Sequence, residues 1–298
     1  MTIAACYLSA EGVVVGADST TTMFVAGRGG QPGSQHHYNF AQKVFEFGEP
    51  ESTIGIVLWG LGSLGDKSYR TLIAEIADEA KRQKLDSLEA VARLAGSMFW
   101  TQYTTAFADS FDRVRELDAK GTERTNEEAG ELSWWKQNLS GGFCLGGRWG
   151  ARRLPGAYEL QFDPLTTVPP EPKALSLGNA KFWGCPNLIE RLIFGMDYPL
   201  FERILQSDKW TGTGDELFNL IDQGALGQPW DLPLREAIDW VYASIYTTIK
   251  AMKFSHLAPV CGGPIEVAVI SSDRPFRWVR HKRMAEAIAA QEVREDRP

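Results

Sequence analysis

The chain has 298 residues, 44% hydrophobic and 23% charged, with a formal net charge of −7, which is typical of a globular protein and excludes wholesale disorder. The acidic balance argues against nucleic-acid binding, and no apolar run approaches the roughly 18–20 residues of a membrane span. The first residues lack a basic segment followed by an apolar core, so we expect a cytoplasmic protein without a signal peptide.

The first sixty residues favour β-structure. Strands are predicted at residues 3–8, 13–15, 43–47 and 52–59. Residues 9–12 have the composition of a tight hairpin turn. Residues 27–39 are polar and rich in glycine, which predicts a surface loop before the third strand.

Helical patterns come next. Residues 66–84 place apolar side chains at helical spacing, and a second helix is predicted to begin near Asp86 and to run past Phe111. Residues 118–138 are polar and charged, which predicts an inserted loop with one short helix.

The second half mixes both kinds of element. Strands are predicted at residues 141–147, 157–162, 174–177, 265–271 and 276–279, and helices at residues 186–194, 233–252 and 281–295. The order lacks regular βαβα alternation, so it indicates stacked antiparallel sheets with helices outside them. No repeat or linker divides the chain, so residues 1–298 are expected to form a single domain, with insertions near residues 27–40 and 112–140.

Residues 60–65 read G-x-G-x-x-G, the pattern of a dinucleotide-binding turn. Such a unit needs a second strand after its helix, ending in an acidic residue about 20 positions on. In this chain Asp78 and Glu79 lie inside the helical pattern, and a further helix follows. We therefore expect a glycine turn that allows close backbone approach, and no nucleotide or other cofactor.

A threonine follows the initiator methionine. If Met1 is removed, Thr2 carries both a hydroxyl and an α-amine. A hydroxyl needs a base that accepts its proton, and an α-amine with a reference pKa of about 7.7–8.0 is partly neutral at cellular pH. Thr2 could therefore supply both nucleophile and base, and the positions of the four histidines indicate no triad.

Two charged residues could assist Thr2. Asp18 ends the second predicted strand and Lys43 begins the third, so adjacent strands could bring both beside the chain terminus. A lysine there would disfavour protonation of the amine, and the aspartate would hold the lysine charged and in place.

This ordered set resembles the start of proteasome β-type subunits. The segments TIAA at residues 2–5 and GVVVGADS at residues 12–19 are similar to the family's N-terminal threonine and "GVVVAADS"-like strand. Residues 42–47 (QKVFEF) resemble its "KKV" strand, and residues 59–62 (WGLG) stand where it has an "AGG"-like turn. The resemblance implies Thr2 as nucleophile, Asp18 and Lys43 as its charge pair, and the Gly60 N–H as oxyanion donor.

Later segments resemble the bacterial ancestral-β-subunit (Anbu) branch of that family. The similar runs are residues 157–164, 178–192 and 261–265. The family's supporting Asp and Ser are matched by Ala258 and Cys261, and its Gly-Ser-Gly-Ser run is matched by residues 178–181. The residues that would support the threonine therefore differ from those of the proteasome family.

The resemblance implies an α+β, four-layer αββα sandwich with two stacked antiparallel sheets, the Ntn-hydrolase fold. It further implies a threonine-type protease that cleaves peptide or amide bonds, and self-assembly into a ring or open spiral homo-oligomer; any partner ATPase stays undefined. The implied substrate-binding residues are Thr22, Phe45, Leu58, Gly62 and Asn179. The alternatives are a non-catalytic assembly subunit and a small-molecule amidase of the same superfamily.

Other candidates are weaker. The four cysteines, Cys6, Cys144, Cys185 and Cys261, are widely spaced, as is typical of buried reduced thiols, although Cys261 could approach the active site. The pair Trp134 and Trp135 could form an exposed patch or fold back onto the body. His36 and His37 have no further spaced ligands, so we expect no metal site there. Lys181, like Asn179, could support the site or touch substrate.

Overall fold

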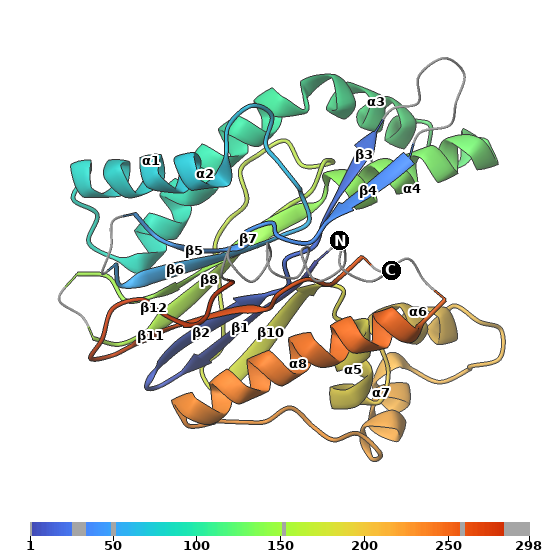
Figure 1. The fold of residues 1–298 in the computed structure, drawn as a ribbon. Coiled ribbons are helices and arrows are strands. Elements are labelled where there is room, and N and C mark those ends of the chain that lie inside the picture. The colour runs from blue at the N-terminus through green and yellow to red at the C-terminus, as the bar shows by residue number, and fades with distance from the viewer. Residues whose placement is uncertain (1, 26–33, 49–51, 151–152, 257–259, 283–298) are drawn as a thin grey trace, which may run out of the picture.

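The computed structural model describes residues 2–25, 34–48, 52–150, 153–256 and 260–282, and they form a mixed α+β fold (Figure 1). The strands are β1 (Ile3–Ser9), β2 (Gly12–Ala17), β3 (Thr21–Val25), β4 (Ser34–Tyr38), β5 (Val44–Glu46), β6 (Ile54–Trp59), β7 (Gly141–Gly147), β8 (Gly156–Phe162), β9 (Lys173–Ala174), β10 (Asn179–Gly184), β11 (Glu266–Ser271) and β12 (Arg277–Arg280). The helices are α1 (Tyr69–Arg82), α2 (Leu88–Ala106), α3 (Ala108–Ala119), α4 (Asn126–Leu139), α5 (Asn187–Phe194), α6 (Tyr198–Leu205), α7 (Gly214–Asp222) and α8 (Leu234–Phe254), with one 3₁₀ turn at Gly121–Glu123.

Two five-stranded sheets carry the fold, and every strand pair in them is antiparallel. The first sheet, sheet I, has the order β10-β1-β2-β11-β12, and the second, sheet II, has the order β5-β6-β7-β8-β9. Strands β3 and β4 form a separate two-stranded hairpin. The predicted α+β class with antiparallel sheets is therefore confirmed.

The sheets pack against each other through the inner face of β1. Ala4 and Cys6 belong to the apolar cluster between the sheets, together with Val57 and Cys144 of sheet II. Successive strand residues point to opposite faces, so the alternate residues of β1 meet α8 on the outer face instead. Tyr7 is one of these, and it is fully buried.

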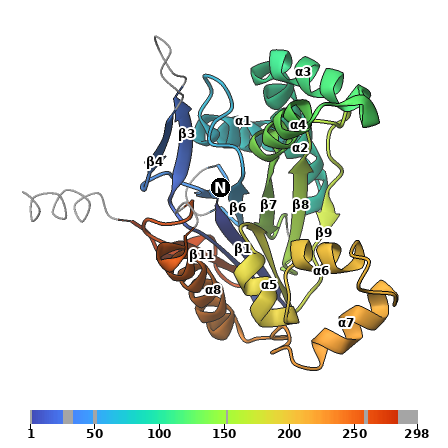
Figure 2. The same cartoon turned by 90° about the vertical axis from the view of Figure 1, so that its right-hand side faces the viewer.

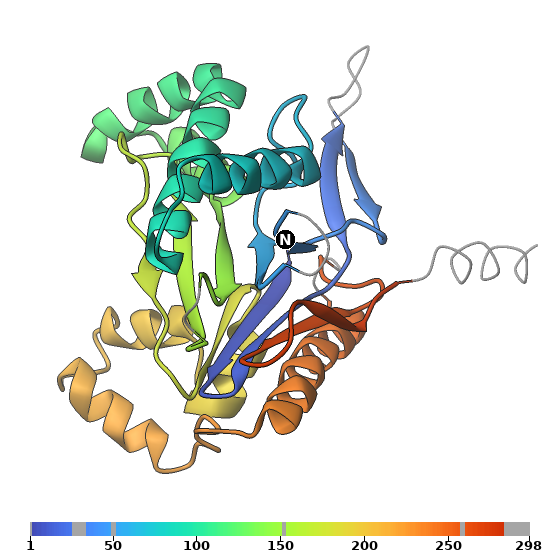
Figure 3. The same ribbon diagram turned by 90° about the vertical axis from the view of Figure 1, so that its left-hand side faces the viewer.

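Helices cover the outer faces of both sheets. In Figures 1 and 3, α1 and α2 lie over sheet II, whereas α8 runs along the opposite side of sheet I. The cluster beneath α1 and α2 is rich in aromatic rings, with Phe99 and Phe143 at 4.5 Å between ring centroids. Figure 2 shows α5, α6 and α7 grouped at one end of the molecule. Among the described helices, none combines the length and apolarity needed to cross a bilayer.

Helix starts follow the local sequence. The Ser68 hydroxyl accepts a hydrogen bond from the Thr71 N–H at the start of α1, and the Ser87 hydroxyl accepts one from the Ala90 N–H at the start of α2. The helix predicted to run past Phe111 is interrupted at Phe107, where α2 ends and α3 follows.

The loop prediction for residues 27–39 was wrong over β4. Residues 34–38 pair with β3, and within this hairpin the Thr22 hydroxyl lies 3.0 Å from His37 Nδ1. A polar hairpin outside the two main sheets shows none of the apolar alternation by which strands are recognised in sequence.

The helix predicted within the loop at residues 118–138 is present, but it is longer than the short helix expected, because α4 has 14 residues. Thr125 and Glu128 form a reciprocal capping box at its start, and Arg113 of α3 pairs with Glu131. Polar contacts thus stabilise a helix with few buried residues, which explains its weak periodicity. Trp134 is 42% exposed.

Strands β3 and β10 and helices α6 and α7 were not predicted, and the strand predicted at residues 174–177 overlaps β9 only at Ala174. The remaining predicted strands and helices are present within a few residues of the expected bounds. Most of the helix predicted at residues 281–295 lies outside the described residues.

The close approach of α8 to sheet I gives a stability prediction. Gly16 of β2 leaves space that Val241 and the fully buried Ile245 fill. Ile245→Ala should lower the free energy of unfolding by about 3 kcal/mol, because it opens a cavity in this cluster. Urea denaturation measures the change, with the exposed Thr247→Ala of the same helix as control. An equal loss of unfolding free energy in the two variants would contradict the close packing of Ile245 against β2.

Candidate active site

The Asp18 carboxylate lies at the end of β2 and is completely buried. Its Oδ1 accepts hydrogen bonds from the Ile3 N–H at 3.2 Å and from Lys43 Nζ at 2.6 Å. Its Oδ2 accepts from the Thr20 N–H at 3.2 Å and from the Gly262 N–H at 2.9 Å. One local donor and three donors from other segments of the chain therefore stabilise the carboxylate.

Lys43 precedes β5, and only 7% of it is exposed. Besides its ion pair with Asp18, its ammonium group donates to the Thr20 carbonyl oxygen. A buried ammonium needs an opposite charge and further acceptors, and these two oxygens provide them. The pair predicted from the sequence is therefore formed in the structure.

Thr2 lies beside this pair at the start of β1. Its neighbour Ile3 bonds Asp18 twice, through the Ile3 N–H to Oδ1 and through the Asp18 N–H to the Ile3 carbonyl at 3.1 Å. Thr2 is 3% exposed and lines one cavity together with Lys43 and Gly60. The structure thus brings together all four residues of the predicted catalytic set.

Gly60 forms the turn after β6. Its φ of +84° is a left-handed conformation, and a Cβ there would lie 2.4 Å from the Ser140 carbonyl oxygen. Only glycine fits this turn. The dinucleotide interpretation of residues 60–65 is excluded, because β6 pairs antiparallel with β5 and β7, and α1 leads into α2.

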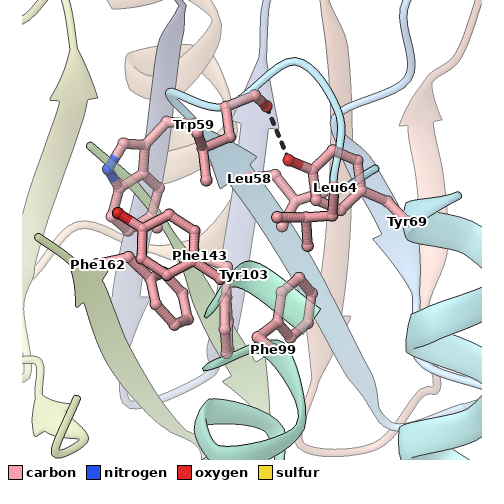
Figure 4. A pocket seen from close by; sticks show the side chains of 10 residues that line it. Leu58, Trp59, Leu64, Tyr69, Phe99, Tyr103, Phe143 and Phe162 are labelled. Atoms are coloured by element: carbon pink, nitrogen blue, oxygen red, sulfur yellow. Dashed lines mark hydrogen bonds between the residues drawn. The ribbon is translucent and has the colours of Figure 1, made fainter. Parts of the chain in front are cut away.

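The cavity continues toward an apolar pocket, shown in Figure 4. Leu58, Trp59, Leu61 and Tyr69 line both spaces, and aromatic rings of α2, β7 and β8 close the inner one. The Tyr69 hydroxyl donates to the Leu61 carbonyl at 2.8 Å, the dashed line in Figure 4. Burial raises the pKa of Tyr69 above its ordinary value, so the phenol stays a donor.

The predicted substrate-binding residues divide into two groups. Thr22, Leu58 and Gly62 line the cavity that contains Thr2. Phe45 lines a different cavity, against Arg70 and His281. Asn179 pairs with Leu8 at the far end of β1, so the structure does not bring it to Thr2.

The supporting residues matched at 178–181 are likewise distant from Thr2, because the register of β10 places Gly184 opposite Ile3. Lys181 instead pairs with the buried Glu159. The residue that reaches Thr2 is Cys185, whose sulfur accepts a hydrogen bond from the Thr2 N–H. Sequence reasoning missed it, because β10, whose register brings Cys185 to Thr2, was not predicted.

Gly184 makes this contact possible. Its φ is +86°, and a Cβ there would lie 1.9 Å from the Thr2 carbonyl oxygen. Cys261 also belongs to the site, because the next residue, Gly262, donates to Asp18. Ala258 and Met1 lie outside the described residues.

Two further sequence candidates do not extend the site. Cys6 packs between the sheets in the apolar cluster that contains Cys144. Within the described part of the chain, no three His, Cys, Asp or Glu side chains gather in a way that could hold a metal ion.

Comparison with known proteins finds similarity among solved structures. No protein-family model and no curated protein matches the chain. Among solved structures, it is similar to an Anbu (Gly-1) mutant from Hyphomicrobium sp. strain MC1, with 13% identity and a TM-score of 0.47. The similarity covers 100% of this chain and 98% of the other.

The buried ion pair gives a second stability prediction. Lys43→Met leaves the Asp18 carboxylate buried without a counter-charge, so the free energy of unfolding should fall by about 3 kcal/mol. In urea denaturation, the double variant Asp18→Asn with Lys43→Met should lose less free energy of unfolding than the two single variants lose together.

The half-exposed pair of Lys67 and Glu75 provides the control, because exposed ion pairs contribute little. Lys67→Met should leave the urea midpoint close to that of the wild type. Strictly additive effects at Asp18 and Lys43 would show that the two groups do not depend on each other.

Proposed function

We propose that the chain is a proteasome-like N-terminal threonine hydrolase that cleaves a peptide or amide bond after Met1 is removed. The observation that carries the proposal is the shared cavity of Thr2, Lys43 and Gly60, with Lys43 bound to the buried Asp18. The resemblance of residues 2–5, 12–19 and 42–47 to proteasome β-type subunits supports the same function.

In the proposed reaction, Thr2 Oγ attacks the amide carbonyl carbon while the Thr2 α-amine accepts the hydroxyl proton. The amine then delivers this proton to the leaving nitrogen, the C–N bond breaks, and an ester joins Thr2 to the acyl group. Water hydrolyses the ester and restores the hydroxyl. The Gly60 N–H would stabilise the oxyanion, a contribution on the order of 3 kcal/mol for one donor.

Lys43 would act through its charge. An ammonium group beside the α-amine disfavours a second positive charge there and so keeps the amine available as a base. Asp18 would hold Lys43 and the start of β1 in fixed positions, because it bonds both Lys43 and the Ile3 N–H.

The proposal includes the Ntn-hydrolase sandwich in a single domain. The contacts that support it are the two facing sheets, the helices over sheet II and helix α8 over sheet I. Leu58 and Leu61 line the cavity that contains Thr2, which favours substrates with an apolar side chain next to the scissile bond.

The proposed activity predicts covalent labelling of residue 2. A peptide β-lactone should acylate Thr2 Oγ through opening of its ring, and intact mass should increase by the whole mass of the reagent. The protein is prepared with a removable leader that leaves Thr2 first, and peptide mapping locates the label. Thr2→Ala should lose labelling by at least about a hundredfold, whereas Thr2→Ser should keep it.

The exposed Thr247→Ala variant is the control, and it should be labelled at the wild-type rate. Intact mass before labelling establishes that Thr2 is the first residue. An unlabelled wild type with a verified Thr2 terminus would overturn the catalytic proposal.

A second candidate, a non-catalytic assembly subunit, is favoured by the apolar side chains exposed on one end of the molecule. These are Leu192, Phe194, Tyr198, Leu200, Phe218, Leu220 and Leu226, from α5 to the segment after α7. Contiguous exposed apolar surface is typical of protein interfaces. Self-assembly into a ring or open spiral is compatible with either candidate.

Self-assembly through this end predicts a native mass of several chains in analytical ultracentrifugation. Leu220, which is 60% exposed on α7, should matter because a carboxylate buried there is costly. Leu220→Glu should shift the protein toward monomer, whereas Val168→Glu, at the 65% exposed Val168, should not. A monomeric wild type would contradict the assembly proposal.

A further inference from the structure

Two cysteines meet beside the candidate nucleophile. Cys185 follows β10 and accepts a hydrogen bond from the Thr2 N–H, and Cys261 precedes Gly262, whose N–H holds Asp18. Their thiols are hydrogen-bonded to each other within one apolar cluster that also contains Ile3. The pair therefore joins the two segments that position Thr2 and Asp18.

The two thiols differ in their chemistry. The hydrogen bond from the Cys261 S–H lowers the pKa of Cys185 below its ordinary value, despite burial. The same bond, together with burial, raises the pKa of Cys261. The Thr2 N–H also donates to the Cys185 sulfur and no such backbone donor reaches Cys261 among the described contacts, so we assign Cys185 as the sulfur that reacts first and Cys261 as the one that keeps its proton until a second step.

We propose that Cys185 and Cys261 are a modification site, at which a hydroperoxide forms a reversible disulfide that inactivates the Thr2 site. The Cys185 thiolate attacks one peroxide oxygen, which breaks the O–O bond and gives a sulfenic acid and an alcohol or water. The Cys261 sulfur then attacks the sulfenic sulfur, and water leaves. In sum, two thiols and one hydroperoxide give one disulfide, one alcohol or water, and one further water.

The disulfide would disturb the site at two points. It draws the sulfurs together to about 2.05 Å, much closer than hydrogen-bonded thiols stand. Cys261 would move with its neighbour Gly262, whose N–H lies 2.9 Å from Asp18 Oδ2. Cys185 would become a disulfide sulfur, which is a weaker acceptor for the nitrogen of Thr2, the proposed base.

The chain contains a matched comparison pair. Cys6 and Cys144 are also hydrogen-bonded, but they lie between the two sheets and are fully buried. Burial raises the pKa of Cys144 well above its ordinary value, which opposes thiolate formation. Cys185 and Cys261 keep 4% and 3% of their surface exposed. Oxidation should therefore reach the pair beside Thr2 first.

The experiment treats the whole folded protein with hydrogen peroxide, alkylates the remaining thiols and maps the peptides by mass spectrometry. We expect a Cys185–Cys261 cross-link that dithiothreitol reverses, while Cys6 and Cys144 are recovered as thiols. The rate should rise with pH and level off below the ordinary thiol range, because the thiolate is the reacting form. Absence of the cross-link, or earlier oxidation of Cys6 and Cys144, would overturn the proposal.

Two variants test the assigned roles. Cys261→Ser should let Cys185 stop at the sulfenic acid, which dimedone traps, whereas Cys185→Ser should give neither product. Cys144→Ala, in the comparison pair, should still form the cross-link. The wild-type measurement decides the proposal even where a variant does not fold.

The inactivating effect rests on the proposed function, whereas the disulfide does not. Lactone labelling of the oxidised protein should be roughly tenfold slower or more, and dithiothreitol should restore it. A cross-link without any labelling of the reduced protein would refute the hydrolase and keep the modification site. A cross-link that leaves labelling unchanged would refute the inactivation alone, and labelling without a cross-link would refute the modification site alone.

Discussion

The candidate site depends on one buried ion pair. Besides the nearby Thr20 N–H, Asp18 accepts hydrogen bonds from β1, from Lys43 and from the turn at Gly262, which are far apart in the sequence. An ionised carboxylate without water is tolerated only when its acceptor positions are filled. The charge therefore fixes the relative positions of sheet I, the segment before β5 and the turn before β11, and with them the position of Thr2.

Much of this arrangement could be predicted from the sequence. Strands β1, β2 and β6 consist of apolar or β-branched residues, and a buried strand of this kind is recognisable without its partners. Asp18 follows β2 and Lys43 precedes β5, and these strands belong to different sheets, so the two residues meet because the sheets pack face to face and not because their strands are adjacent. Gly60 was recognisable because a glycine after a buried strand indicates a tight turn.

Other features depend on contacts that no local pattern encodes. Helix α4 has few buried residues, and charged pairs with α3 stabilise it, so its apolar periodicity is weak. The register of β10 against β1 decides that Cys185 meets Thr2, whereas similarity of short motifs pointed to residues 178–181. A motif match does not reveal which residue of β10 lies opposite the start of β1, because that depends on the register in which the two strands pair.

Gly184 lies where β10 passes the first residue of β1, and any side chain there would collide with the Thr2 carbonyl. The clash concerns the end of a strand and not the apolar clusters between and around the sheets. A larger residue at position 184 could leave both sheets intact and still displace Thr2 from its position beside Asp18 and Lys43. A single substitution at Gly184 could therefore displace Thr2 while both sheets remain, so chains that share this fold need not share the geometry of the candidate site.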